Sequence, residues 1–245
     1  MLGETNVDPT APHWMLSALQ QVPQDRAIGL LLRHADREAL IKDFEQSNIQ
    51  PVTEVGRQRS LHLGKVLGSR LVRCHSSPLT RCMQTMQYVQ QGAGIEVDIV
   101  ENRLLGDPGI FVVDAERAGQ TWTKIPVEQI NQNLSVKDVE PLSGMARGYE
   151  ASMFAIQHML SQMHEVSGVH VFCSHDSIIG PICSQVFGHV FSVSEWPLFL
   201  EGVLFWRDGL DIHFWFRDFV GKLLYPLCQV QQSMVIAYAR WILHR

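Results

Sequence analysis

The chain has few cysteines, and none of them forms a closely spaced pair. It contains five, an odd number, without the short spacing that zinc and redox motifs use. Most of them fall in apolar segments, where a free cysteine is typical of a small buried residue. This pattern favours a reducing compartment. The cysteines are Cys74, Cys82, Cys173, Cys183 and Cys228. His158 and His164, six positions apart, lack the spacing of a metal pair on one helix face, so no metal is predicted.

Long apolar runs and a strong net charge are also missing. No run reaches the roughly 18 to 20 apolar residues that span a bilayer, and residues 1–10 carry acids but no apolar stretch typical of a signal peptide. The formal net charge of -5 gives no reason to expect nucleic acid as a partner. We therefore expect a cytoplasmic protein that binds neither membranes nor nucleic acid, with any positive field confined to a site for a small anion.

The sequence contains no Gly-x-Ser-x-Gly elbow, internal repeat or low-complexity segment. A serine hydrolase is disfavoured, because the consecutive Ser174, His175 and Asp176 at a helix start would point in different directions. With 245 residues and 46% hydrophobic content, the chain can bury one substantial core. We expect a single α/β domain over residues 1–245.

Three short apolar runs end on ionisable residues. Residues 27–32 read as a strand buried on both faces of a parallel sheet, and similar runs at 71–75 and 169–173 are each followed by a helical pattern. Ligands of such sheets bind beyond the carboxyl ends of the strands. The groups presented there are Arg33, His34 and Arg37 after the first run, Arg81 after the second, and His175 and Asp176 after the third. If the strands are neighbours, all six groups face one pocket.

These residue types suit a phosphomonoester dianion. An arginine meets phosphate oxygens with a planar fork of donors. At ~4 Å and an effective dielectric of ~20, each cation contributes on the order of 4 kcal/mol of Coulomb attraction before desolvation is deducted. Three arginines can thus hold a dianion without a metal. Neighbouring cations also disfavour a protonated imidazole, so His34 is expected to have a lowered pKa and a lone pair available for attack.

Four short motifs give the chain a family resemblance. They are Arg33-His34-Ala35, Thr53-Glu54-Val55-Gly56, Ser77-Pro78-Leu79-Thr80-Arg81 and the late His175. At these residues the chain resembles the histidine phosphatase superfamily, which includes phosphoglycerate mutases and histidine acid phosphatases. The resemblance implies a three-layer sandwich in which helices flank a mixed, mostly parallel sheet. Arg37 and His175-Asp176 resemble the acid phosphatase branch, whereas the length and the Ser-Pro-Leu-Thr-Arg element resemble the compact mutase branch.

Two positions depart from the family pattern. Ala35 replaces the usual glycine of the first motif, which slightly narrows how closely the backbone can approach phosphate. Ala39 stands where the acid phosphatase branch has proline.

The resemblance also implies roles for the site residues. His34 would be the nucleophile that becomes a phosphohistidine. Arg33, Arg37, Arg81 and His175 would bind the phosphoryl group. Asp176 would be the general acid, with Glu101 as the competing assignment.

The expected function is a hydrolase of small phosphomonoesters that needs neither metal nor cofactor. The alternatives are a phosphomutase with the same pocket and a non-catalytic phosphate-binding or scaffolding protein.

The remaining pattern gives coarser expectations. Residues 12–22, 53–69 and 144–165 read as helices, a fourth helix runs from Asp176 to 190, and 95–100 reads as a strand. The Asp208-Gly209 pair predicts a hairpin joining 202–206 to 210–216.

Two further segments carry expectations of their own. Residues 101–140 look irregular and are expected to cover the site, with Arg103, Arg117, Trp122 and Lys124 as weaker candidates for substrate contact. The apolar spacing of 229–245 is near-helical; packing on the parent domain is favoured over a homodimer face, and the oligomeric state is left open.

Overall fold

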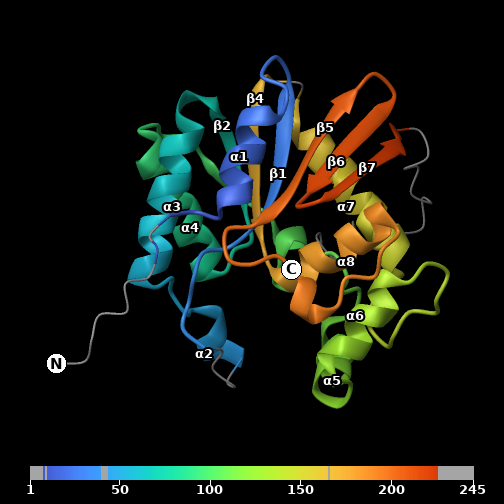
Figure 1. Cartoon of the computed structure of the whole chain (residues 1–245). Helices are drawn as coiled ribbons and strands as arrows, with labels where there is room; N and C mark the ends of the chain where they lie inside the picture. The colour runs from blue at the N-terminus through green and yellow to red at the C-terminus, as the bar shows by residue number, and fades with distance from the viewer. Residues whose placement is uncertain (1–7, 9, 40–43, 165, 226–245) are drawn as a thin grey trace.

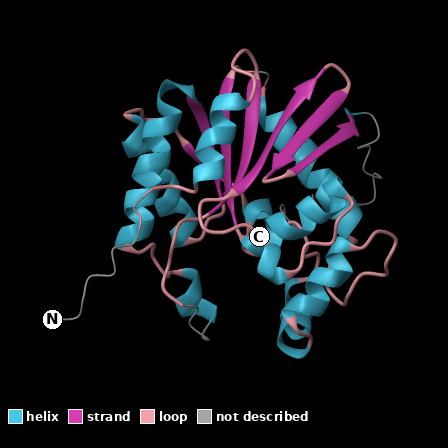
Figure 2. Ribbon diagram, in the orientation of Figure 1, coloured by secondary structure: helices cyan, strands magenta, loops and turns pink. Residues whose placement is uncertain are grey.

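The computed structural model describes residues 8, 10–39, 44–164 and 166–225. Within them the chain forms a seven-stranded sheet with the strand order β3-β2-β4-β1-β5-β6-β7 (Figure 1). Helices lie on both faces of this sheet (Figure 2). The strands are β1 Ala27–Arg33, β2 Leu71–Ser76, β3 Ile99–Glu101, β4 Gly168–Ser174, β5 Gly202–Asp208, β6 Asp211–Phe216 and β7 Phe219–Leu224. The predicted α/β class and mixed sheet are confirmed.

Strand β1 lies where the sheet changes from parallel to antiparallel pairing. It pairs in parallel with β4, with Arg33 opposite Ser174, and antiparallel with β5. Strand β2 is parallel to β4 on its other side. The carboxyl ends of β1, β2 and β4 therefore share one edge of the sheet. This edge is where the ionisable residues of the three predicted strands emerge.

One face of the sheet is covered by helices α1 His13–Gln21, α3 Glu54–Leu67 and α4 Thr80–Ala93. Thr53 caps α3, because its Oγ1 accepts a hydrogen bond from the Gly56 backbone N–H at 3.1 Å. Helices α3 and α4 approach closely: a Cβ on Gly64 would lie 2.0 Å from the Val89 carbonyl oxygen. The helix predicted over 53–69 is shorter than expected, since its last residues form a 3-10 turn, η1 Gly68–Arg70.

The other face carries α7 Gly148–Met163 and α8 Asp176–Phe187. Three methionines of α7, Met153, Met159 and Met163, are buried in the core on this face. Helix α8 begins at Asp176 as expected but ends three residues before position 190. Gly188 there adopts the left-handed conformation (φ 65°), and its N–H bonds to Ser184 O.

The interpretation of 101–140 as irregular was wrong. The segment contains the 3-10 turn η2 Arg103–Leu105 and two helices, α5 Ala115–Lys124 and α6 Val127–Ser135. The Asp114 side chain caps α5 by accepting from the Arg117 N–H at 3.1 Å. Only a few of their residues are both apolar and buried, among them Ala118, Ile130 and Leu134, so the apolar periodicity was too sparse to show in the sequence.

Three smaller differences concern short elements. The strand expected over 95–100 is confined to β3 at 99–101. The short helix α2 Phe44–Asn48 and the edge strand β7 were not predicted. The hairpin around Gly209 (φ 60°) forms as expected, joining β5 to β6. The tail at 229–245 and Cys228 lie outside the described residues.

The four described cysteines are free and buried: Cys74, Cys82, Cys173 and Cys183. Of the helices described, none is long and apolar enough to cross a membrane.

Candidate active site

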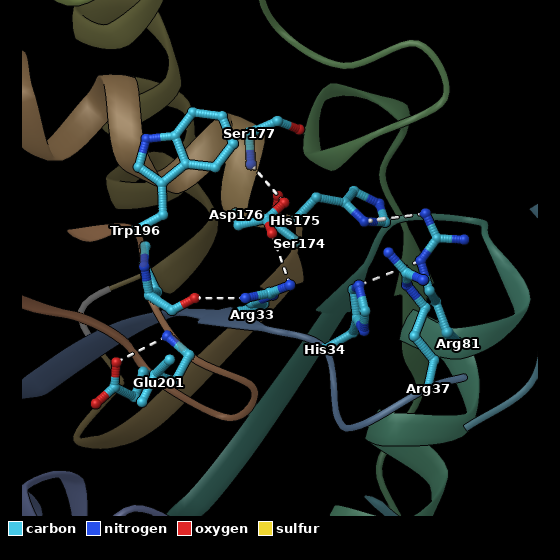
Figure 3. A network of polar contacts seen from close by, with 12 residues as sticks. Arg33, His34, Arg37, Arg81, Ser174, His175, Asp176, Ser177, Trp196 and Glu201 are labelled. Carbon is cyan, nitrogen blue, oxygen red and sulfur yellow. Dashed lines mark hydrogen bonds and ion pairs between the residues drawn. The ribbon is translucent and has the colours of Figure 1, made fainter. Parts of the chain in front are cut away.

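His34, Arg81 and His175 lie together at the carboxyl edge of the sheet (Figure 3). Arg81 connects the two imidazoles: its Nε donates to His34 Nε2 at 3.2 Å, and its Nη2 donates to His175 Nδ1 at 3.3 Å. The two ring centroids are 5.4 Å apart. Arg81 also donates to the Ser47 carbonyl oxygen at 3.0 Å, so its guanidinium fills the space between the rings.

The contacts of His34 define its tautomer. Nδ1 lies 2.8 Å from the Ala35 carbonyl oxygen, which can only accept, so Nδ1 carries the proton. Nε2 accepts from Arg81 and therefore holds a lone pair. Burial, followed by the nearby His175 and Arg81, lowers the pKa of His34 well below its ordinary 6.5. His34 is 2% exposed, and its lowered pKa favours the uncharged ring at neutral pH.

His175 is held between Arg81 and Ser77. Its Nε2 lies 3.0 Å from Ser77 Oγ, while its Nδ1 accepts from Arg81. Gly106 packs directly on this pair: a Cβ at that position would lie 2.5 Å from the His175 ring and 2.7 Å from Ser77 Oγ. Gly106 also has a φ of +149°, a backbone angle that residues with a side chain rarely adopt. The sequence pattern of 101–140 did not indicate Gly106 as a site residue, so its contact with His175 was missed.

Arg33 and Asp176 form an ion pair beside this cluster. Arg33 Nη2 lies 2.6 Å from Asp176 Oδ2, and Arg33 Nη1 donates to the Pro197 carbonyl oxygen at 2.7 Å. The Ser177 backbone N–H donates to Asp176 Oδ1 at 2.8 Å. The ring of Phe199 lies over the guanidinium, 4.2 Å from Arg33 Cζ.

Arg37 lies next to Arg81 and His34 (Figure 3). Burial, followed by the nearby charge of Arg81, lowers the pKa of Arg37, and Asp176 opposes this effect. One of its donors, Nη1, bonds to the Glu38 carbonyl oxygen at 2.8 Å, while the buried Nε has no partner among the described residues. The structure thus joins His34, Arg81 and His175 by hydrogen bonds, pairs Arg33 with Asp176 beside them, and places Arg37 next to Arg81.

Glu101 lies away from the cluster around His34. It is exposed at the end of β3 and lines a separate cavity of about 350 Å³ together with His75, His158 and Arg103. Arg103 is paired there with Asp107 at 3.1 Å, and Trp122 is exposed on α5. The competing acid is therefore not among the residues that surround His34, whereas Asp176 contacts Arg33.

A buried carboxylate, Glu201, organises the loop that carries Pro197 and Phe199. Trp14 Nε1 donates to Glu201 Oε1 at 2.6 Å, while the Leu198 N–H (2.8 Å) and the Arg217 guanidinium donate to Oε2. The Arg33 N–H bonds to the Glu201 carbonyl oxygen at 2.8 Å. Sequence reasoning did not find this loop. The acid inside the apolar run 196–205 was the only signal for it.

The fold agrees with what the motifs predicted. Residues 30–104 match the family described as histidine phosphatase superfamily (branch 1), which confirms the resemblance to that superfamily. No curated protein matches the chain.

Solved structures with a similar fold include three phosphatases. Phosphoserine phosphatase from Entamoeba histolytica, a mutant in complex with phosphoserine, has a TM-score of 0.50 and 15% identity, covering 79% of this chain and 96% of its own. Mycobacterial glucosyl-3-phosphoglycerate phosphatase with inorganic phosphate has a TM-score of 0.47 and 14% identity, covering 82% and 95%. The putative phosphohistidine phosphatase SixA from Agrobacterium tumefaciens has 0.42 and 13%, covering 80% and 98%. At 15% identity the likeness to the Entamoeba histolytica enzyme concerns the fold alone.

Proposed function

We propose that the chain is a metal-independent phosphomonoester hydrolase that works through a phosphohistidine on His34. The superfamily match supports a phosphatase or mutase type of activity. The observation that carries the finer proposal is the uncharged His34 ring, whose Nε2 lone pair faces a guanidinium. An imidazole in this state is a nucleophile, and the surrounding arginines supply the charge that a phosphoryl dianion needs.

Substrate binding exchanges hydrogen bonds within the cluster. In the free enzyme, N–H groups of Arg81 donate to the imidazole nitrogens and Arg33 pairs with Asp176. When substrate binds, the phosphoryl oxygens accept these hydrogen bonds instead. This exchange frees the lone pair of His34. The Ser77 hydroxyl can donate as well as accept, so His175 can hold its proton on Nδ1 and offer it to a phosphoryl oxygen without gaining a charge.

The first chemical step forms the bond between His34 Nε2 and phosphorus and breaks the bond from phosphorus to the alcohol oxygen. Asp176 gives its proton to that oxygen. In the free enzyme the Asp176 carboxylate is paired with Arg33 at 2.6 Å. When Arg33 turns its donors to the phosphoryl group, the Asp176 carboxylate takes up a proton from solvent, and this is the proton that it gives to the alcohol oxygen.

The second step frees His34 and leaves Asp176 protonated, and that proton returns to solvent when the ion pair with Arg33 forms again. Water loses a proton to the Asp176 carboxylate and attacks phosphorus, the bond to Nε2 breaks, and inorganic phosphate leaves. A phosphomutase would carry out the same first step and give the phosphoryl group to a second alcohol. A binding protein would stop before either step.

We also propose that the single domain spans residues 1–245 and that 101–140 covers the site. The contact of Gly106 with His175 supports the cover. The substrate is proposed to be a small phosphorylated molecule, and the free buried thiols favour a cytoplasmic setting.

The test is phosphate release from several phosphomonoesters with a chelator present. We expect activity in the parent, near-complete loss in His34→Ala, and no change in the control His189→Ala, whose ring lies on the surface. Asp176→Ala should affect alkyl esters more than p-nitrophenyl phosphate, because a good leaving group needs little protonation. Equal rates in the parent and His34→Ala would refute the proposal. Labelled phosphoryl groups retained on organic product, with little free phosphate, would identify a mutase.

A further inference from the structure

An apolar segment, Pro197–Leu198–Phe199, borders the candidate site on the side of Asp176. We propose that this segment selects the substrate: the phosphomonoester is that of an uncharged alcohol with a planar apolar face, and Phe199 is the specificity-determining residue. This inference rests on the proposed function and adds the chemical class of the leaving group.

The cations of the cluster serve the phosphoryl group alone. They are Arg33, Arg37 and Arg81, since both imidazoles accept from Arg81 through a lone pair and are uncharged. In the free enzyme the Asp176 carboxylate offsets one of them, and once Asp176 is protonated all three face the two negative charges of a phosphomonoester dianion. The phosphoryl group therefore engages every cation of the cluster.

Two further acids near the cluster already form ion pairs, which occupy the neighbouring arginines. Asp36 pairs with Arg59 at 2.7 Å, and Glu201 pairs with Arg217. Among the residues that the structure describes around His34, no cation is left to receive a second anionic group of the substrate. A carboxylate on the alcohol would then lose its hydration without gaining a partner.

Phe199 lies where the alcohol is expected to leave. Its ring is 4.2 Å from Arg33 Cζ and 5.6 Å, centroid to centroid, from the His34 ring. The same guanidinium reaches Asp176, the proposed acid, at 2.6 Å. The ring thus lies near both the nucleophile and the guanidinium that pairs with the proposed acid, and it keeps part of its surface exposed.

Leu198 extends this apolar surface outward, and it is 60% exposed. The segment is held in place, because the Leu198 N–H bonds to the buried Glu201 carboxylate and the Pro197 carbonyl oxygen bonds to Arg33. A fixed aromatic ring binds an apolar or planar group with little ordering of its own.

The test compares three unactivated alkyl phosphates: benzyl phosphate, propyl phosphate and O-phosphoserine. All three need protonation of the leaving oxygen, so differences report on the alcohol. We expect kcat/KM to be highest for benzyl phosphate and lowest for phosphoserine. Phe199→Ala should lower kcat/KM for benzyl phosphate by about tenfold or more and that for phosphoserine by less than about threefold. Phe219→Ala, on β7 among Phe187 and Phe191, is the matched control and should leave this ratio unchanged.

A gain-of-function variant tests the inference without removing a side chain that contacts the site. Leu198→Lys adds a cation at an exposed position and should raise kcat/KM for phosphoserine relative to benzyl phosphate by about threefold or more. A parent enzyme that prefers phosphoserine would overturn the inference, and so would an equal loss of kcat/KM on all three esters in Phe199→Ala. In either case, phosphate release from p-nitrophenyl phosphate that depends on His34 would still support the proposed hydrolase. Absence of any His34-dependent release would remove both.

Discussion

Replacing Arg217 with methionine should destabilise the fold and disturb the site at the same time. Arg217 is the cation of Glu201, whose side chain is only 4% exposed, and it also donates to the Glu195 carbonyl oxygen at 3.1 Å. In Arg217→Met the carboxylate keeps Trp14 and the Leu198 N–H as donors but loses its counter-charge. Removing one partner of a buried ion pair costs about 3 to 5 kcal/mol. Because two donors remain, we expect about 3 kcal/mol.

Urea unfolding followed by tryptophan fluorescence measures this loss, and Trp14 reports on it locally because its Nε1 bonds to Glu201. The control is Arg147→Met, which breaks an exposed pair with Glu140 and should change the free energy of unfolding by less than about 1 kcal/mol. In the Glu201→Gln background, Arg217→Met should cost only about 1 kcal/mol, the value of the remaining hydrogen bonds.

The double-mutant cycle therefore predicts a coupling of about 2 kcal/mol between Arg217 and Glu201. In Arg217→Met, kcat/KM should also fall, because the loop that carries Pro197 and Phe199 loses its anchor. A coupling near zero would refute the reasoning. It would mean that the buried carboxylate does not depend on this cation.

Three further outcomes follow from the contacts of single residues. The ring of His34, whose pKa is lowered, should remain unprotonated at pH 5.5 in an NMR titration; half-protonation near 6.5 would contradict this. Burial lowers the pKa of His75 to about 4, so the unfolded chain takes up a proton first as pH falls from 6.5. His75 should therefore contribute about 3 kcal/mol to the stability that the parent loses between pH 7 and pH 4, and His75→Phe, which keeps the ring stacked on Phe172, should lose about 3 kcal/mol less than the parent. Gly106→Ala should lower kcat/KM by more than about tenfold by displacing His175, whereas Gly119→Ala, which has open space around it, should not.

The strand ends were the predictable part of the site. Short apolar runs interrupted by arginine and histidine mark both a strand and the edge where it stops, so His34, Arg81 and His175 could be grouped before the fold was known. That grouping used the sequence only locally. The pairing of β1 with β4, which brings the residues within hydrogen-bond reach, is a property of the folded sheet.

The parts that were missed depend on contacts between distant segments. Glu201 is recognisable only once Trp14 and Arg217 surround it, and Gly106 only once His175 packs on it. Helices α5 and α6 expose most of their polar residues and bury few apolar ones. The periodicity of apolar residues in the sequence gives little information about such helices, because contacts with other segments of the fold supply most of their stability.

The hydrogen bond from His34 Nδ1 to the carbonyl oxygen of Ala35 has a regiochemical consequence. Since that nitrogen is occupied by its own proton, a trapped covalent adduct can be only one of the two isomers that an imidazole allows, the one bearing phosphorus on Nε2. Phosphorus–nitrogen couplings distinguish these isomers, so a single spectrum of the quenched enzyme would report which ring atom had reacted.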